Sequence, residues 1–289
     1  MDQRIIDLYD EFTHGTMGRR RFLDRLAVLA GGTAAASALL PLLQSDDALA
    51  QTVAESDARI ATETFAIAGV DKLNGYLVTP QAPGRHPAVI VIHENRGLTP
   101  HIKDVARRLG TAGFTTLALD FLSPMGGTPL DEDQARTMIG QLKPADAVAS
   151  SRAALAALKI HPRANGKVGA VGFCWGGGQV NALAVADPTL DAGVAYYGRQ
   201  PAADSVAAIR APLLLHYAGN DAPINSGIPA YEAALKAAGK SYELYVYPGV
   251  QHAFNNDTSA ARYDKEAANL AWSRTLAFFR KHLGETVRS

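Results

Sequence analysis

From Gln51 onward, short apolar runs of strand length alternate with longer segments of helical periodicity, and this alternation constrains the fold more than any other feature. The apolar runs are rich in Val, Ile and Leu and span residues 87–94, 114–120, 167–173, 191–198, 211–219 and 242–248. The segments with apolar residues at steps of three and four are 101–113, 144–161, 176–187, 228–240 and 261–283. Near-continuous apolar strands between helices are typical of a mostly parallel sheet with helices on both faces.

Two more runs, 65–70 and 73–80, are expected to open the sheet as an antiparallel pair. Residues 122–134 form the most loop-like segment, and we expect them to border a pocket, because such sheets bind ligands where loops lengthen at strand C-termini. Residues 51–289 contain no repeat, low-complexity tract or Pro/Ser linker. We therefore predict one α/β domain over residues 51–289.

The first 50 residues have the pattern of an export signal. A run of arginines at 19–21 precedes an apolar stretch, and residues 26–43 carry no charge. This pattern resembles a twin-arginine signal. The sequence ALA at 48–50 has the small residues that signal peptidase prefers. We expect passage through the twin-arginine export machinery, cleavage after Ala50, a periplasmic product, and no stable membrane association after cleavage.

Two alternatives for this leader stay open. The apolar stretch could remain uncleaved as an N-terminal anchor, although it is weakly hydrophobic for a membrane span. The leader before the arginines is also long for a signal, so Met17 is an alternative start of the chain.

Composition excludes several other classes of protein. The chain balances 28 basic against 28 acidic residues and shows no basic stripe after its first thirty residues, so we do not expect nucleic acid as a partner. A single cysteine excludes an internal disulfide, and the common zinc-ligand spacings are missing. We therefore expect neither a metal nor a cofactor.

The only cysteine, Cys174, lies in the sequence VGAVGFCWGGGQV at 168–180. Gly172 and Gly176 flank it, as a sharp strand-to-helix turn requires when it pushes a nucleophilic side chain outward. The thiol then stands at a helix N-terminus, where the helix dipole and free N–H groups favour the thiolate. We predict that Cys174 is a nucleophile and that the N–H of Trp175 donates to an oxyanion. An inert buried cysteine is the alternative.

Three more polar residues, Glu94, Asp221 and His252, directly follow predicted strands, whose carboxyl ends meet at one edge of the sheet. The order nucleophile, acid, histidine is that of the α/β-hydrolase fold. We expect His252 to take a proton from Cys174 or from water, and Asp221 to orient the imidazole and stabilise its charged form.

Glu94 has two possible roles, and two histidines besides His252 are expected to lie outside the catalytic group. A carboxylate beside the thiol can accept its proton, whereas a solvated strand-end glutamate is the alternative for Glu94. His216 lies within a predicted strand and is expected in the core, and His14 belongs to the leader.

Together these motifs resemble the dienelactone hydrolase family, the cysteine-nucleophile branch of the α/β hydrolases. The motif GFCWGGG at 172–178 is its most specific element, and HENRGL at 93–98, YYG at 196–198 and PGVQHAF at 248–254 support it. The similarity covers about residues 60–283. It implies a carboxylic ester hydrolase, similar to carboxymethylenebutenolidase, that cleaves a small lactone or ester through a thioacyl intermediate on Cys174.

The resemblance also assigns supporting roles. In that family a glutamate after the third strand hydrogen-bonds the resting thiol and helps to generate the thiolate, and Glu94 occupies the matching position. The oxyanion donors of the family correspond to the backbone N–H groups of Asn95 and Trp175.

The sequence departs from the family at two positions. Members that act on dienelactone hold the substrate carboxylate with two arginines, and the matching positions here are Pro124 and Asn256. Neither residue can form a charge-assisted pair. Arg96 is a possible substitute cation, with an exposed surface arginine as the alternative.

Aromatic residues near the motifs are candidate walls of the substrate pocket. Tyr197 and Phe254 are the candidates that we name as substrate contacts, and Tyr196 and Trp175 could add to them. All four could equally belong to the core.

Two rival functions remain besides the hydrolase. A nucleotide-binding protein is disfavoured because GFCWGGG lacks the spacing of known phosphate-binding loops. A non-catalytic small-molecule-binding protein on an α/β-hydrolase scaffold is the stronger rival, since a fold alone does not establish function.

Overall fold

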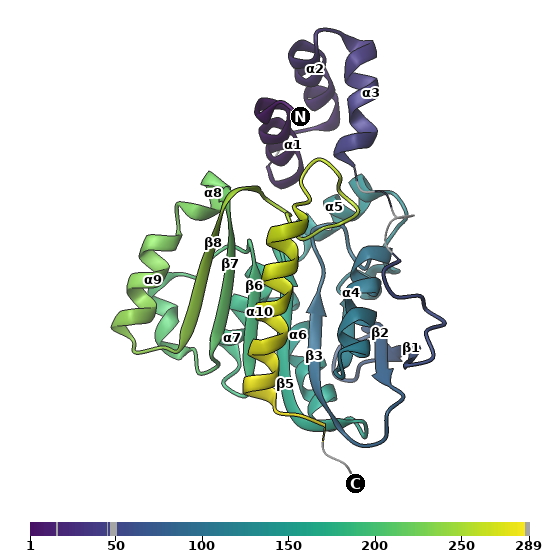
Figure 1. Ribbon diagram of the computed structural model, residues 1–289, viewed down its shortest axis with the longest axis vertical. Coiled ribbons are helices and arrows are strands. Elements are labelled where there is room, and N and C mark those ends of the chain that lie inside the picture. Colours follow the sequence, from purple (N-terminus) through teal and green to yellow (C-terminus); the bar gives the residue numbers. More distant parts are fainter. Residues whose placement is uncertain (16, 45, 47–50, 287–289) are drawn as a thin grey trace.

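The computed structural model describes residues 1–15, 17–44, 46 and 51–286 (Figure 1). The cleavage position expected at 48–50 lies outside these residues. The described strands are β1 (Ile60–Ala66), β2 (Asn74–Pro80), β3 (His86–Ile92), β4 (Thr115–Asp120), β5 (Ala164–Phe173), β6 (Ala192–Tyr196), β7 (Leu213–Asn220) and β8 (Tyr242–Gln251). The helices are α1 (Gln3–His14), α2 (Arg19–Ala30), α3 (Thr33–Leu43), α4 (Pro100–Thr111), η2 (Ser123–Met125), α5 (Glu132–Gln141), α6 (Pro144–Lys159), α7 (Trp175–Ala186), η3 (Ala203–Ala208), α8 (Ala222–Asn225), α9 (Ile228–Ala237) and α10 (Lys265–Leu283).

The strands form one sheet in the order β1-β2-β4-β3-β5-β6-β7-β8. The pairs β1–β2 and β2–β4 are antiparallel, and all other neighbours are parallel. This arrangement confirms the predicted α/β-hydrolase fold with a mostly parallel sheet. The expected opening strand at 65–70 is wrong in its bounds, because β1 ends at Ala66. Residues 67–70 instead turn the chain into β2, with Gly69 at a φ of 92° that favours glycine.

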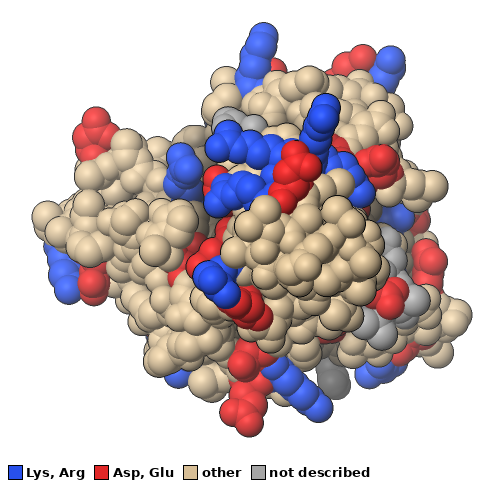
Figure 2. Space-filling view, turned by 90° about the horizontal axis from the view of Figure 1, so that it is seen from above, with Lys and Arg blue, Asp and Glu red and all other residues tan. Residues whose placement is uncertain are grey.

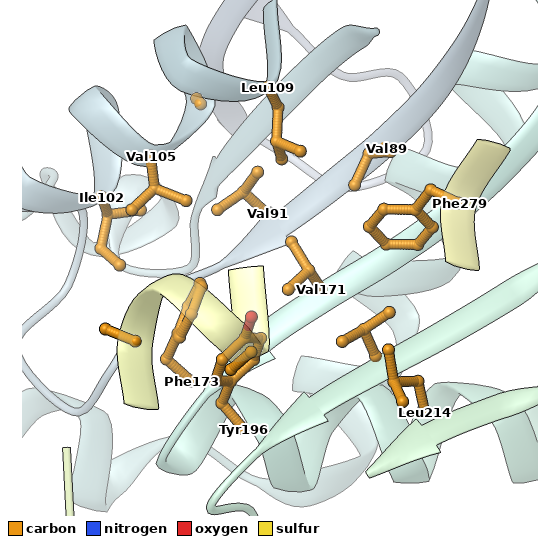
Figure 3. Packing of buried hydrophobic residues seen from close by; sticks show 14 of the residues in the cluster. Val89, Val91, Ile102, Val105, Leu109, Val171, Phe173, Tyr196, Leu214 and Phe279 are labelled. Atoms are coloured by element: carbon orange, nitrogen blue, oxygen red, sulfur yellow. The ribbon is translucent and has the colours of Figure 1, made fainter. Parts of the chain in front are cut away.

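Helices cover both faces of the sheet, as β3 illustrates. Its residues alternate, so that Val89 and Val91 belong to one apolar cluster and Ile90 to the other. The first cluster packs against α4 and α10, as Figure 3 shows for Leu109 and Phe279. The second packs against α6, α7 and α9. Because each fully buried aliphatic or aromatic side chain contributes about 1.5–3 kcal/mol, these two clusters fix the strands that carry the site.

The segment expected to be a loop, residues 122–134, is partly helical. It contains η2 and the start of α5, whose N-terminus is capped by Asp131. The Asp131 side chain accepts hydrogen bonds from the N–H groups of Asp133 and Gln134. An N-cap aspartate before an acidic first turn is a helix-start signal that outweighs the loop-like composition preceding it.

Helices α1, α2 and α3 form a separate layer, here called the N-terminal cap, at one end of the α/β domain (Figure 1). The cap has its own small apolar cluster, built around Tyr9, Phe12 and Phe22. Figure 2 views the molecule from this end, where basic and acidic side chains lie close together. None of the described helices is by itself long and apolar enough to span a membrane. Taken together, α2 and α3 have the required length and composition, but they meet at an angle of 111°.

Candidate active site

Cys174 stands between β5 and α7 in a strained turn. Its φ of 55° and ψ of −116° lie in a region that residues with a side chain rarely adopt. A Cβ on Gly172 would lie closer than 3.0 Å to the backbone of Gly176 and Gly177. A Cβ on Gly176 would collide with the carbonyl oxygen of Ile92. Both flanking positions therefore require glycine, and the turn holds the sulfur at the carboxyl edge of the sheet.

Asp221 and His252 form a buried pair beside this turn. Asp221 follows β7 and His252 follows β8, and these strands are neighbours in the sheet. His252 Nδ1 lies 2.6 Å from Asp221 Oδ2, while Nε2 of His252 has no hydrogen-bond partner among the described residues. Ring nitrogens of His252 and His14 and the sulfur of Cys174 all lie within 4.8 Å of one another. The structure thus brings the predicted nucleophile, acid and base together.

The charge state of His252 follows from its two neighbours. Burial alone would lower its pKa, but the negative charge of the Cys174 sulfur and the hydrogen bond that Nδ1 donates to Asp221 outweigh burial. The pKa of His252 is therefore raised well above its usual range.

Glu94 is the second residue after β3 and lines the same cavity as Cys174. Its Oε2 accepts a hydrogen bond of 2.8 Å from Asn256 Nδ2. Its Oε1 is buried and has no hydrogen-bond partner among the described residues. Asn256, where the resemblance leads us to expect an arginine, thus holds one oxygen of Glu94 with a neutral amide and leaves the other oxygen free.

Of the two predicted oxyanion donors, Asn95 lines the cavity, and Trp175 directly follows Cys174, which also lines it. Trp175 is the first residue of α7, so its N–H has no acceptor one helical turn earlier. Asn95 lines the cavity, and its side-chain Nδ2 donates to the Thr13 carbonyl at 2.7 Å. The Trp175 indole does not line the cavity. It stacks on His93, with ring centroids 5.4 Å apart.

The aromatic candidates for substrate contact, Tyr197 and Phe254, lie in the apolar core of the sheet. Tyr197 and Phe254 are fully buried and belong to the apolar cluster of the sheet. The ring centroid of Tyr197 lies 4.9 Å from that of His252. Neither residue lines the cavity at Cys174, and their contact with substrate stays a prediction. His216 is buried in the same cluster, as its position within a strand indicated.

Two buried arginines line the cavity. Arg96 pairs with Glu132, and its Nη2 donates to Tyr9 Oη at 3.2 Å. Arg262 donates from Nη1 to Asp10 Oδ1 at 3.2 Å. The structure therefore places Arg96, the expected substitute cation, at the site. Arg262 was not identifiable from the sequence, because nothing in its local pattern distinguishes it from a surface arginine.

Pro124, the other position where the resemblance leads us to expect an arginine, lies in η2 and does not line this cavity. The cations at the site therefore come from two different elements, the loop after β3 and the loop before α10.

The N-terminal cap covers the cavity, with Thr13 and His14 of α1 in its lining. His14, at the end of α1, places Nε2 at 3.1 Å from Cys174 Sγ, and its ring centroid lies 4.4 Å from that of His252. Desolvation and the nearby charge of His252 hold the pKa of His14 well below its usual range. The remaining cavity has a volume of about 10 Å³, which is about the space of one water molecule.

Sequence reasoning assigned His14 to a leader and missed its contact with the sulfur. One signal was present: Ile5, Leu8, Tyr9 and Phe12 recur at helical spacing, which predicts an amphipathic helix. The same contact makes His14, Cys174 and His252 the group of described residues whose donor atoms are close enough to share a metal ion. Imidazole nitrogens and a thiolate are zinc ligands; of the three atoms, His14 Nε2 and Cys174 Sγ are in direct contact at 3.1 Å.

Comparison with known proteins matches two parts of the chain. The model of the dienelactone hydrolase family matches residues 73–283, and a model described as YqhI-like matches residues 1–31. A protein of Bradyrhizobium named "Probable 2-oxo-3-(5-oxofuran-2-ylidene)propanoate lactonase" is 35% identical, with 78% of this chain and 98% of that protein covered. A protein of Saccharolobus solfataricus named "Putative carboxymethylenebutenolidase" is 32% identical, with 73% and 94% covered.

Solved structures agree with these sequence matches. The dienelactone hydrolase from Anabaena variabilis superposes with a TM-score of 0.61 at 26% identity, and the superposition covers 78% of this chain and 98% of that structure. The fold, the matched residues and the relatives agree, and the protein is a hydrolase that belongs to the dienelactone hydrolase family.

Proposed function

We propose that the protein hydrolyses a small lactone or ester through a covalent thioacyl intermediate on Cys174. The observation that carries this proposal is the strained turn at Cys174 beside the buried Asp221–His252 pair. A nucleophile, a base within reach and a third group that orients the base are what covalent acyl transfer requires. Lactones and activated esters suit a thiolate, which is both a good nucleophile and a good leaving group.

Acylation begins with the Cys174 thiolate and the His252 imidazolium. The sulfur attacks the carbonyl carbon, a C–S bond forms, and the carbonyl electron pair moves onto oxygen. The N–H groups of Asn95 and Trp175 donate to this oxyanion. When the carbonyl re-forms, the C–O bond to the alkoxide breaks and His252 Nε2 gives its proton to the alkoxide.

Deacylation uses the same base in the opposite direction. Neutral His252 takes a proton from water, and the hydroxide oxygen attacks the thioester carbon. A C–O bond forms, the C–S bond breaks, and the thiolate returns beside an imidazolium. One water is consumed, and the products are an acid and an alcohol, joined in one molecule when the substrate is a lactone.

Glu94 provides a second acceptor for the thiol proton. Its free Oε1 is buried and the residue lines the same cavity as Cys174. The hydrogen bond from Asn256 holds the other oxygen. We therefore assign Glu94 to thiolate formation before acylation: the proton of the neutral thiol moves to Oε1 of Glu94 and stays there, while His252 enters acylation as the imidazolium that its raised pKa favours.

The substrate class follows from the two arginines. Arg96 and Arg262 line the cavity of Cys174 and both are buried, so an anionic substituent on the acyl or alkoxide part would be held by charge-assisted hydrogen bonds. The Bradyrhizobium relative is named for a lactone that carries a propanoate group. We propose that anionic lactones are preferred over neutral esters of the same size.

We also propose that residues 1–50 act as a twin-arginine signal and that the product is periplasmic. The support is the exposed arginine run at the start of α2 and the uncharged stretch after it. N-terminal sequencing of the protein from periplasmic and cytoplasmic fractions tests this. A periplasmic form starting at Gln51 is expected, and a purely cytoplasmic full-length chain would contradict it.

The test of the activity is a panel of lactones and aryl esters, with and without a carboxylate, combined with intact-mass detection of an acyl adduct. In the form that starts at Gln51 we expect turnover, and a single acyl group on Cys174 at early times. Cys174→Ala should show neither. A protein that binds the compounds without turnover and without an adduct would instead be a non-catalytic binder.

A further inference from the structure

Helix α1 occupies the position that a substrate needs. A carbonyl carbon must come to about 3–3.5 Å from the sulfur for attack, and His14 Nε2 already lies at 3.1 Å. With α1 in place the cavity of about 10 Å³ cannot hold even a small ester. The structure therefore describes a closed state of the site.

Polar contacts hold α1 over the site. Asp10 accepts from Arg262 and Tyr9 accepts from Arg96, the two arginines that we assign to substrate. The Thr13 carbonyl accepts from Asn95. Each of these groups of the α/β domain would face the cavity if α1 were absent. The helix therefore accepts, with its own side chains and backbone, hydrogen bonds that these groups could otherwise donate to a substrate.

A second set of contacts lies at the edge of the site. Arg136 of α5 donates to the Phe12 carbonyl and places its Cζ 4.0 Å from the centroid of the Phe12 ring. Arg19 pairs with Asp133, also on α5. Helix α5, which we did not predict from the sequence, thus contacts both α1 and α2.

The apolar cores of the two parts are separate. The cluster of the cap contains residues of α1 to α3 and Met17, and among the described residues of the α/β domain Ala261 packs against it. An attachment made mostly of hydrogen bonds and ion pairs resembles a transient domain interface more than a shared core. The cap can therefore leave without exposing the core of the sheet.

We propose that α1 is an inhibitory plug, which keeps Cys174 closed to substrate until the N-terminal segment is displaced or removed. This proposal rests on the proposed function for its biological meaning, but the closure itself is a property of the thiol. If residues 1–50 are removed on export, as we propose, the same cut that completes export opens the enzyme. The protein would then remain inactive in the compartment where it is made.

The test measures alkylation of Cys174, the only thiol of the chain, by iodoacetamide under native conditions. In full-length protein, Asp10→Arg places a third cation against Arg262 and Arg96 and should release α1. Losing a buried charge pair shifts such an equilibrium by more than about tenfold, so we expect alkylation at least about tenfold faster. Asp7→Arg, a matched change on the exposed face of α1, should leave the rate unchanged.

A second variant keeps the test decisive if Asp10→Arg does not fold, as judged by circular dichroism and thermal melting. His14→Ala removes the ring from the sulfur and leaves the anchoring contacts in place, so alkylation should again become faster. Folded Asp10→Arg with the wild-type rate, or His14→Ala with an unchanged or slower rate, would overturn the plug.

Ester turnover in the same samples separates the two proposals. Faster alkylation without turnover in any variant would leave the plug in place and contradict the proposed hydrolysis. If the variants are alkylated at the wild-type rate and the wild-type protein turns over the ester fully, the plug is contradicted and the proposed hydrolysis is supported.

Discussion

The α/β domain and the N-terminal cap lie against each other but are stabilised in different ways. The domain has two large apolar clusters, one on each face of an eight-stranded sheet. The cap has one small cluster and meets the domain through hydrogen bonds and ion pairs. The residues of the proposed chemistry therefore lie in the part with the larger cores, and His14 of the part with the small core covers the sulfur.

The two histidines beside the sulfur offer the sharpest contrast. His252 belongs to the domain and His14 to the cap. We expect His252→Ala to lower kcat/KM by at least about 10³-fold, because a base of the catalytic group is lost. His14→Ala should not lower it, and should raise it if the plug limits access. Steady-state kinetics with an aryl ester measures both, and a large loss in His14→Ala would make that residue part of the machinery.

Matched phenylalanine substitutions compare the stability of the two parts. Phe279→Ala in the sheet core should lower the free energy of unfolding by about 3–5 kcal/mol. Phe22→Ala, equally buried but in the cap, should leave the main unfolding transition in place and accelerate alkylation of Cys174. Urea unfolding followed by circular dichroism gives the first quantity. Equal losses in the main transition would show that the parts unfold as one unit.

Substitution of Glu94 separates thiolate formation from binding. Glu94→Gln removes the proton acceptor and keeps the contact with Asn256, so acylation should slow by about 100-fold while KM changes little. Pre-steady-state release of p-nitrophenol measures acylation directly. If the burst rate matches that of the wild-type protein, Glu94 has no part in the chemistry.

A smaller effect concerns the pKa of His252. The charge of the Cys174 sulfur is the strongest influence that raises this pKa, so Cys174→Ser should lower it. NMR titration of the imidazole measures the change. A pKa that does not move in the serine variant would mean that the sulfur carries no charge at rest.

The raised pKa also determines how stability depends on pH. A folded-state pKa above the unfolded value of about 6.5 gives a contribution that is complete below that value and disappears as the pH rises through the folded pKa. In Cys174→Ser this contribution should be smaller, and it should disappear completely at a lower pH than in the wild-type protein.

The predicted site came together because parallel strands end at one edge. Glu94, Cys174, Asp221 and His252 each follow a strand, and their spacing along the chain is irrelevant once the strands align. The turn at Cys174 was also predictable, because only glycine fits at Gly172 and Gly176. Local sequence was sufficient wherever backbone geometry determined the position.

What the sequence did not reveal depends on contacts between distant segments. Asp10 and Arg262 are 252 residues apart, and neither carries a local signal of its partner. The edge strand β1 was misplaced because its exposed, polar alternation is weaker than the apolar run that follows it. The role of α1 was hidden for the same reason, since helical periodicity indicates a buried face but not the surface that buries it.

The most direct test of the account is to incubate the Asp10→Arg protein with p-nitrophenyl acetate, quench at early times, and digest it for peptide mass spectrometry. We predict one acetyl group on the peptide that contains Cys174, at a higher level than in the Asp7→Arg protein. An acetyl group on any other residue, or an unmodified Cys174 in protein that releases p-nitrophenol, would contradict the account.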